Sequence, residues 1–301
     1  MAYRLDLVRE VEAEVQRVAT EQIDKALVEI RDEQSSQADT IHQVRKRCKK
    51  LRALVRLVRG ALADPGLYAF ENASFRDAAR SLSAVRDAEV LVETYDKLTD
   101  ASAGNAEWQQ FGAVRAALVR RRDELTGQKQ ELAEGLKAFS ETMTEARQRV
   151  TSWHLSAEGF DAVASGFART YRRGRRAMSA TYDDLTGASF HEWRKRVKYH
   201  WYHCRLLRHL WVPVMKARIG ELDRLATLLG DYHDLDVLAA RLVDLPNEAA
   251  DEDTTAQLRL TIGRRQEQIR QEARPRGERL FAEKTKHLRR RVQAYWNASQ
   301  E

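Results

Sequence analysis

Apolar residues recur three or four positions apart along almost the entire chain, which is the spacing of one face of an α-helix. Valine and isoleucine are dispersed at this spacing and never alternate with polar residues over the length of a strand. The pattern breaks where turn-forming residues gather, as at Asp64-Pro65-Gly66, Val212-Pro213 and Arg274-Pro275. It predicts an all-α protein of nine helices, at residues 3–32, 38–63, 75–98, 106–151, 159–182, 189–211, 216–245, 254–273 and 276–297.

The sequence contains an internal repeat. One pattern of a histidine followed by three basic residues occurs as His42-x-x-Arg45-x-Arg47-x-Lys49 and recurs 149 residues later as His191-x-x-Arg194-x-Arg196-x-Lys198. Residues 82–91 (LSAVRDAEVL) match residues 229–238 (LGDYHDLDVL), and residues 167–176 match residues 281–290. The repeat predicts one duplicated domain over residues 1–301 with pseudo-two-fold symmetry. Its parts are an extra N-terminal helix (1–36), a first four-helix bundle (37–184) and a second four-helix bundle (185–301).

Composition narrows the class of protein. No segment approaches the roughly 20 consecutive apolar residues that span a bilayer, and the N-terminus is acidic and amphipathic, unlike a signal peptide. Two isolated cysteines, Cys48 and Cys204, fit neither a disulfide framework nor paired metal ligands, so both are expected in the core. These features predict a soluble cytoplasmic protein without a membrane partner.

Charge is distributed unevenly along the chain. The total is +7, from 52 Lys and Arg against 45 Asp and Glu, yet residues 1–40 hold five basic and ten acidic residues. Residues 41–60 contain eight Lys and Arg and no acid, and further basic runs occupy residues 169–176, 190–209 and 284–291. Exposed helices usually mix charges of both signs. Such runs favour an anionic ligand, although solvated basic surface is the simpler alternative.

The basic residues of 41–60 fall on one helix face. His42, Arg45, Lys49, Arg52 and Arg56 are spaced 3, 4, 3 and 4 apart, which places them along roughly 20 Å of helix beside a separate apolar stripe. Guanidinium and ammonium groups at about one per turn suit a linear chain of phosphates. Base readout and single-strand binding need amide side chains or aromatic platforms, which are scarce in the first run. The pattern therefore favours phosphate chains over nucleic acid.

The duplicated HxxRxxxK helices, in an all-helical chain near 300 residues, resemble the CHAD family (conserved histidine α-helical domain). That resemblance implies two four-helix bundles around a basic pore that binds inorganic polyphosphate. It implies ligand roles for His42, Arg45, Lys49, Lys50 and Arg56 in the first half and for His191, Arg194, Lys198 and Arg205 in the second. Tyr199 and Trp201 stand where the first half has Lys50 and Arg52. The ExExK strand of the triphosphate-tunnel domain often fused to this family does not occur.

The basic runs extend the candidate set beyond the two histidine helices. The polyphosphate-binding candidates are His42, Arg45, Lys49, Lys50, Arg52, Arg56, Arg121, Arg122, Arg172, Arg173, Arg176, His191, Arg194, Lys198, Tyr199, Arg205, Arg264, Arg265, Lys286 and Arg290. The two motif histidines have a second interpretation as hydrogen-bonding links between helices. Asp87 and Asp234, which follow Arg86 and His233 in the repeat, are expected to bond or orient basic residues.

No motif indicates catalysis, a metal or a cofactor. There is no glycine-rich phosphate loop, no GxSxG, no metal-ligand cluster, and the sequence suggests no paired carboxylates beside the basic face. The sequence thus predicts a non-enzymatic polyphosphate-binding protein, associated with polyphosphate granules, whose basic face also admits phosphorylated small molecules. The alternatives are a general polyanion or nucleic-acid binder and a polyphosphate-processing enzyme.

Overall fold

The computed structural model describes residues 3–32, 34–100, 111–245, 249 and 251–300. Within these residues the only β-type pairing is an isolated bridge between Leu62 and Leu155, so the all-α prediction is confirmed. The described chain forms eleven α-helices, which are α1 (Val11–Arg31), α2 (Gln37–Val58), α3 (Leu67–Ser81), α4 (Ser83–Asp100), α5 (Gly112–Gly127), α6 (Lys129–Arg149), α7 (Gly159–Asp183), α8 (Gly187–Leu206), α9 (Val212–Arg241), α10 (Glu252–Leu280) and α11 (Thr285–Ala298).

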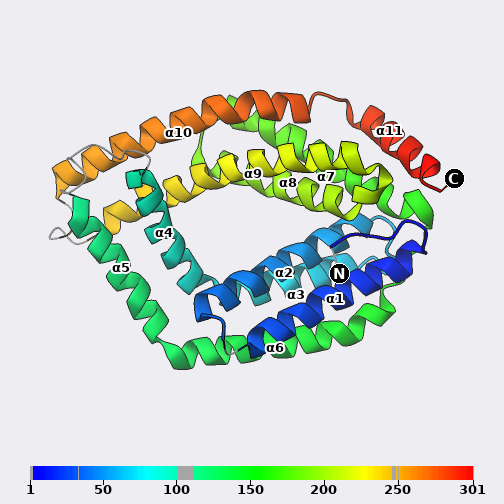
Figure 1. Ribbon diagram of the computed structural model, residues 1–301, viewed down its shortest axis with the longest axis horizontal. Helices are drawn as coiled ribbons and strands as arrows, with labels where there is room; N and C mark the ends of the chain where they lie inside the picture. The colour runs from blue at the N-terminus through cyan, green and yellow to red at the C-terminus, as the bar shows by residue number, and fades with distance from the viewer. Residues whose placement is uncertain (1–2, 33, 101–110, 246–248, 250, 301) are drawn as a thin grey trace.

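The helices form two groups that meet along α2 (Figure 1). In one group α1 and α3 pack on α2, and α6 packs on α1 and α3. In the other group α7, α8, α9 and α10 pack in sequence, with α11 against α7. Helix α2 contacts α7 and α8, while α4 reaches from α2 to α9 and carries α5 on its far side. The acidic helix α1 is thus an integral member of the first group, whereas the internal duplication and the boundaries at residues 36 and 184 stay predictions.

Several helix boundaries differ from those predicted. Residues 3–10 precede α1 without forming an α-helix, and the expected helix 75–98 is two helices that begin earlier, at Leu67, and break at Leu82. The segment expected as 106–151 breaks at Gln128 within its described part, residues 111–151. Pro275 lies inside α10 rather than ending a helix. It is exposed, so water can bond to the carbonyl that its missing N–H leaves free.

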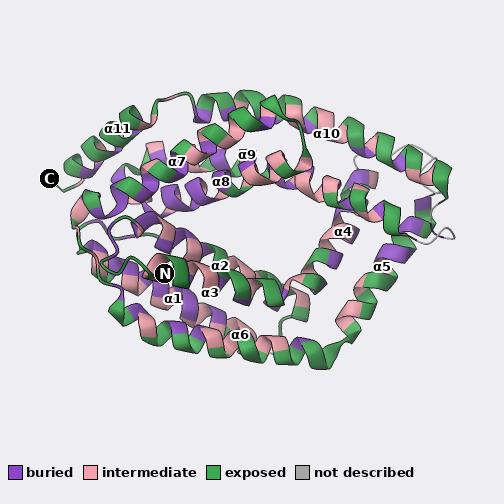
Figure 2. Ribbon diagram, turned by 180° about the vertical axis from the view of Figure 1, so that it is seen from behind, coloured by how far each residue is buried: buried purple, intermediate pink, exposed green. Residues whose placement is uncertain are grey.

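Pro213 likewise starts a helix instead of separating two. It occupies the first turn of α9, where its missing N–H has no intrahelical partner to lose. The apolar stripe predicted for the first basic helix is confirmed, because Ile41, Val44, Cys48 and Leu51 are fully buried. Cys204 is buried as well, as expected of a core cysteine. Figure 2 shows buried positions concentrated where α1, α2, α7 and α8 come together, whereas α5 is largely exposed.

Polar contacts lock the two groups together at the α2–α8 contact. Nε2 of the buried His203 lies 2.9 Å from the carbonyl oxygen of Ala53 on α2. The N-terminal segment crosses the same contact, since the Tyr3 hydroxyl donates to Lys50 O on α2 (2.7 Å) and Leu5 N donates to Leu206 O on α8 (2.9 Å). These bonds satisfy polar groups that would otherwise be buried without partners.

Two buried histidines make this contact sensitive to acid. Burial lowers the pKa of His203 to about 3, and burial with the neighbouring Arg218 charge also holds the pKa of His200 well below its usual range. Both side chains are packed against Phe167 of α7. They are therefore neutral in the folded protein near neutral pH, while the unfolded chain takes up protons below about pH 6.5.

We expect stability to fall as the pH drops, because below about pH 6.5 the unfolded state binds more protons than the folded state. His203 alone accounts for roughly 2 kcal/mol of lost unfolding free energy between about pH 6.5 and pH 5. His203→Gln keeps a donor for Ala53 O without titrating, so its stability should change less with pH. Urea denaturation followed by circular dichroism at several pH values measures this slope. His287→Gln on exposed α11 serves as the control, and equal slopes for H203Q and the wild type would contradict the prediction.

Candidate anion-binding site

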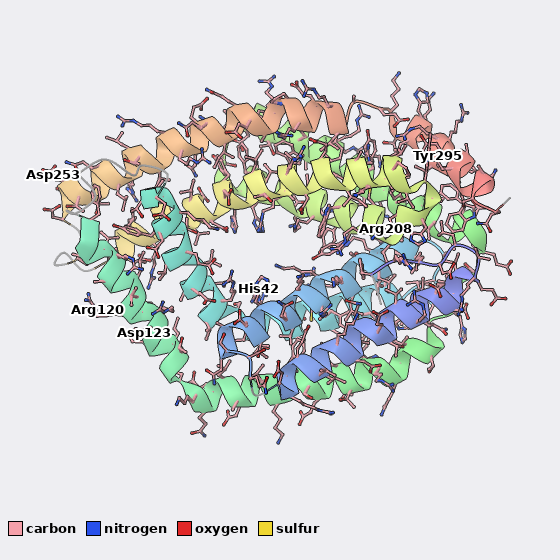
Figure 3. All side chains as sticks on the ribbon, viewed as in Figure 1. His42, Arg120, Asp123, Arg208, Asp253 and Tyr295 are labelled. Atoms are coloured by element: carbon pink, nitrogen blue, oxygen red, sulfur yellow. The ribbon has the colours of Figure 1, made fainter. Side chains whose placement is uncertain are left out.

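The cationic face of α2 forms as its spacing predicts. Ser36 caps the helix by accepting from Asp39 N, which fixes where the helical phase begins. His42 and Lys49 are exposed, and Arg45 is partly buried. Figure 3 shows His42 near the start of α2, on the side toward α4 and α9. The face therefore points into the region enclosed by these helices rather than to the outer surface.

Helix α8 presents the matching cations. Thr186 and Ser189 form a capping box that begins the helix and sets its phase. Arg194 and Lys198 are partly buried on this helix. The Arg194 side chain lies across α9 at Gly230, where a β-carbon would come within 3.3 Å of Nε. The absence of a side chain at Gly230 therefore leaves room for the guanidinium group.

Basic side chains on α2 and α8 repel one another. The pKa of Lys49 is lowered to about 8, mainly because protein surrounds the ammonium group and further because Arg194, Arg45 and Lys198 lie near it. Lys49 is nevertheless exposed to solvent. Burial and the charges of Arg194 and Arg205 likewise lower the pKa of Lys198, against the opposing effect of Asp223. The structure thus brings Lys49, Arg194 and Lys198 together.

The motif histidines lie at the same surface but are neutral near pH 7. Burial, followed by the charges of Arg86 and Lys46, lowers the pKa of His42. Burial and the adjacent His233 lower the pKa of His191 to about 4, and the two imidazole centroids are 4.3 Å apart. A bound anion would oppose both effects, because negative charge favours the protonated ring.

Single carboxylates also lie beside the cationic faces. Asp87 on α4 approaches Arg45 (3.6 Å), and Asp223 on α9 approaches Lys198 (3.8 Å). Burial raises the pKa of Asp234, and the nearby charge of Arg194 opposes that rise. The role predicted for Asp87 is therefore confirmed. Among the described residues, no group of three or more His, Cys, Asp or Glu is arranged to hold a metal ion.

Two guanidinium donors in this region have no acceptor. Nε of Arg194 and Nε of Arg56 are shielded from solvent and form no hydrogen bond with the described residues. Other donors of Arg56 do bond, since Nη2 lies 2.7 Å from Oδ1 of Asn72 on α3. Unpaired buried donors carry a free-energy cost that an added acceptor removes. The site is therefore suited to gain hydrogen bonds from an anion.

The structure separates some predicted ligands from this surface. Lys50 is buried under the Tyr3 ring (5.4 Å), where burial and neighbouring charges lower its pKa to about 7. Tyr199 is buried beneath the guanidinium of Arg56 (4.1 Å).

Other predicted ligands do lie at or next to this surface. Arg205 stacks on Trp201 (4.6 Å) at the same surface as Lys198. Arg52 shares Asn72 with Arg56, so these two arginines continue the α2 face toward α3.

Other predicted residues lie on outer helices. Arg121 and Arg122 are on α5, which lies on the far side of α4 (Figure 1), and they pair with Glu124 and Asp123 of the same helix. Exposed residues on α7, α10 and α11 include Arg172, Arg176, Arg264, Lys286 and Arg290. Arg265 lines a separate hollow of about 150 Å³ with Lys97 and Asp231. Arg172 and Arg173 belong to a further group of arginines, described below, rather than to the surface around Lys49.

Sequence reasoning missed Lys46 and Arg86 as members of this surface. The charges of both residues lower the pKa of His42, and the charge of Lys46 on α2 also lowers the pKa of Lys198 on α8. Lys46 lies within the first basic run, so the run itself was the available signal. Arg86 was noticed only through the repeat, because its carboxylate partners Glu89 and Glu93 on α4 make it resemble an ordinary ion-paired surface residue.

The fold and the site define a class: an all-helical protein in which two cationic helices, one from each half of the chain, face one another. The family model named CHAD domain matches residues 17–243, so the chain belongs to the CHAD family. The crystal structure of the CHAD domain from the plant Ricinus communis aligns over 95% of both chains with a TM-score of 0.58 and 18% identity, which shows a shared fold. The chain matches none of the curated protein sequences with which it was compared. No helix in the described part of the chain is long and apolar enough to cross a bilayer.

The facing arrangement predicts how Lys49 titrates. Its pKa of about 8 depends partly on the Arg194 charge, so Arg194→Ala should raise that pKa. Methyl NMR of reductively dimethylated lysines follows the titration, and Lys49→Gln assigns the resonance. Arg279→Ala on exposed α10 is the control and should leave the Lys49 titration unchanged. An identical Lys49 titration in R194A would mean that α2 and α8 do not face one another as described.

Proposed function

We propose that this protein binds inorganic polyphosphate between α2 and α8 and has no catalytic role. The observation that carries the proposal is the cluster of Lys49, Arg194 and Lys198, contributed by helices 149 residues apart, where burial and then the neighbouring cations lower the pKa of Lys49 to about 8. Mutual repulsion among these cations destabilises the empty site, and a bound polyanion adds attraction that outweighs this repulsion.

A chain of phosphates fits better than a single anion. The α2 face from His42 to Arg56 spans 14 residues, or about 21 Å of helix, with a basic residue or histidine at each turn. Each turn of the helix can therefore contact a different phosphate. Phosphorylated small molecules are expected to occupy part of this face with lower affinity, because they make fewer contacts.

Nucleic acid fits this surface less well. The aromatic rings of the α8 run are already engaged, since Tyr199 and Tyr202 are buried and Trp201 is covered by Lys198 (4.3 Å) and Arg205. Stacking platforms for bases are therefore not free at this surface. The carboxylates of Asp87 and Asp223 pair with basic residues, which supports a role in orienting them rather than in processing a phosphate chain. Association with polyphosphate granules follows from binding as a further part of the proposal.

Removing two facing charges should weaken binding by about tenfold or more, since each charge-assisted contact contributes about 1.5–3 kcal/mol. The variant is Lys49→Ala with Lys198→Ala, titrated calorimetrically with long-chain polyphosphate at about 150 mM salt. Its matched control is Lys129→Ala with Lys137→Ala, which removes the same charge from exposed positions on α6. The control should stay within about twofold of the wild type, because long-range charge effects are screened at this ionic strength.

The same titration distinguishes the alternatives. Absence of polyphosphate binding by the wild type overturns the proposal. Equal weakening in both double variants assigns binding to general positive charge. Displacement by single-stranded RNA or duplex DNA at equal phosphate concentration favours the general polyanion binder, and shortening of the chain in the presence of Mg²⁺ or Mn²⁺ favours a processing enzyme.

A further inference from the structure

A second concentration of arginines lies where α2, α7 and α8 meet. Two adjoining hollows share Arg59 and Arg169; the smaller has a volume of about 10 Å³ and the larger of about 450 Å³. None of the described residues that line them is acidic. We call this region the arginine cleft, and its basic residues are Arg56, Arg59, Arg169, Arg172, Arg173 and Arg196.

Close helix packing creates the arginine cleft. A β-carbon at Gly166 of α7 would lie 1.9 Å from Leu57 O, and one at Gly60, just after α2, would lie 2.0 Å from Oγ of Ser165. A side chain at Gly166 would therefore push α7 away from α2, and one at Gly60 would displace the Ser165 side chain. Because both are glycine, the arginines of α7 reach the same space as Arg56 and Arg59. The hydroxyl-bearing residues Ser165 and Thr285 add polar groups to the larger hollow.

The charges of the arginine cleft are only partly balanced. Glu192 pairs with Arg196 and approaches Arg173 (4.0 Å). Arg169 and Arg172 are exposed on α7. Nε of Arg56 is shielded from solvent and has no acceptor among the described residues. Arg59 and Arg169 lie close enough for their charges to repel. The guanidinium groups of Arg59, Arg169 and Arg172, which line the larger hollow, suit the oxygens of a phosphate group.

The arginine cleft continues the α2 face described above. Arg59 follows Arg56 by three residues, so the row that starts at His42 extends for 17 residues, or about 26 Å of helix. Its first part faces Arg194 and Lys198, and its last part faces Arg173 and Arg169. Arg52 and Arg56 join the two parts through their common partner Asn72.

We propose that the arginine cleft is a second phosphate-binding site, and that a long polyphosphate chain extends from the Lys49–Lys198 surface along α2 into it. This inference rests on the proposed function, because the same chain occupies both places. Short polyphosphates reach only one place at a time, so each place binds its own molecule. Long chains bind both places at once and gain affinity through the high effective concentration of the second segment.

The test compares tripolyphosphate with long-chain polyphosphate by calorimetry. The cleft variant is Arg169→Ala with Arg172→Ala, two exposed residues of α7, and its matched control is Arg259→Ala with Arg279→Ala, two exposed residues of α10. The wild type should bind two tripolyphosphate molecules and the cleft variant one. Long-chain affinity should fall about tenfold or more in the cleft variant and stay within about twofold in the control.

The outcomes separate this inference from the proposed function. If the cleft variant keeps the wild-type stoichiometry and affinity while Lys49→Ala with Lys198→Ala weakens binding, the arginine cleft is not a site and the proposed function stands. If the cleft variant alone weakens binding, the central surface is wrong and the cleft stands. Loss of one tripolyphosphate without a change in long-chain affinity overturns the continuous path. Absence of any binding by the wild type overturns both.

Discussion

The contact between α2 and α8 is the constraint on which the rest of the structure depends. The hydrogen bond between His203 and Ala53 O, together with the residue 3–10 segment that bonds to both helices, fixes how the two helix groups meet. The same contact decides how near Lys49 comes to Arg194 and Lys198. Apolar packing on one side of each helix therefore holds like charges together on the other side, at a cost that burial of the apolar stripe offsets.

Two pairs of neutral histidines play different parts in this arrangement. His200 and His203 are neutral because they lie in the core, where their rings pack and bond like other core groups. His42 and His191 are neutral because partial burial and adjacent cations both disfavour protonation. Only the second pair lies where an added anion would restore the charge. The interhelical bond considered for the motif histidines is made instead by His203, and the ligand role of His42 and His191 stays a prediction.

Glycine and aspartate positions shape the basic surfaces as much as the basic residues do. Gly230 leaves space for the Arg194 side chain, and Gly60 and Gly166 allow α7 to approach α2. Asp87 and Asp223 orient a basic residue on the facing helix by charge attraction. Because each pair is partly exposed, its contribution to stability is small compared with its effect on side-chain direction.

The helical class, the phase of α2 and its cationic face follow from the sequence alone, because helical periodicity and capping act within a few residues of the chain. The family resemblance rested on the same local motifs. Only the tertiary structure decided that Lys50 and Tyr199 are buried, that Arg121 and Arg122 lie on a distant helix, and that Pro275 continues α10. Those outcomes depend on which helix faces meet. Packing between residues far apart in the chain determines which faces meet, and no local sequence pattern predicts it.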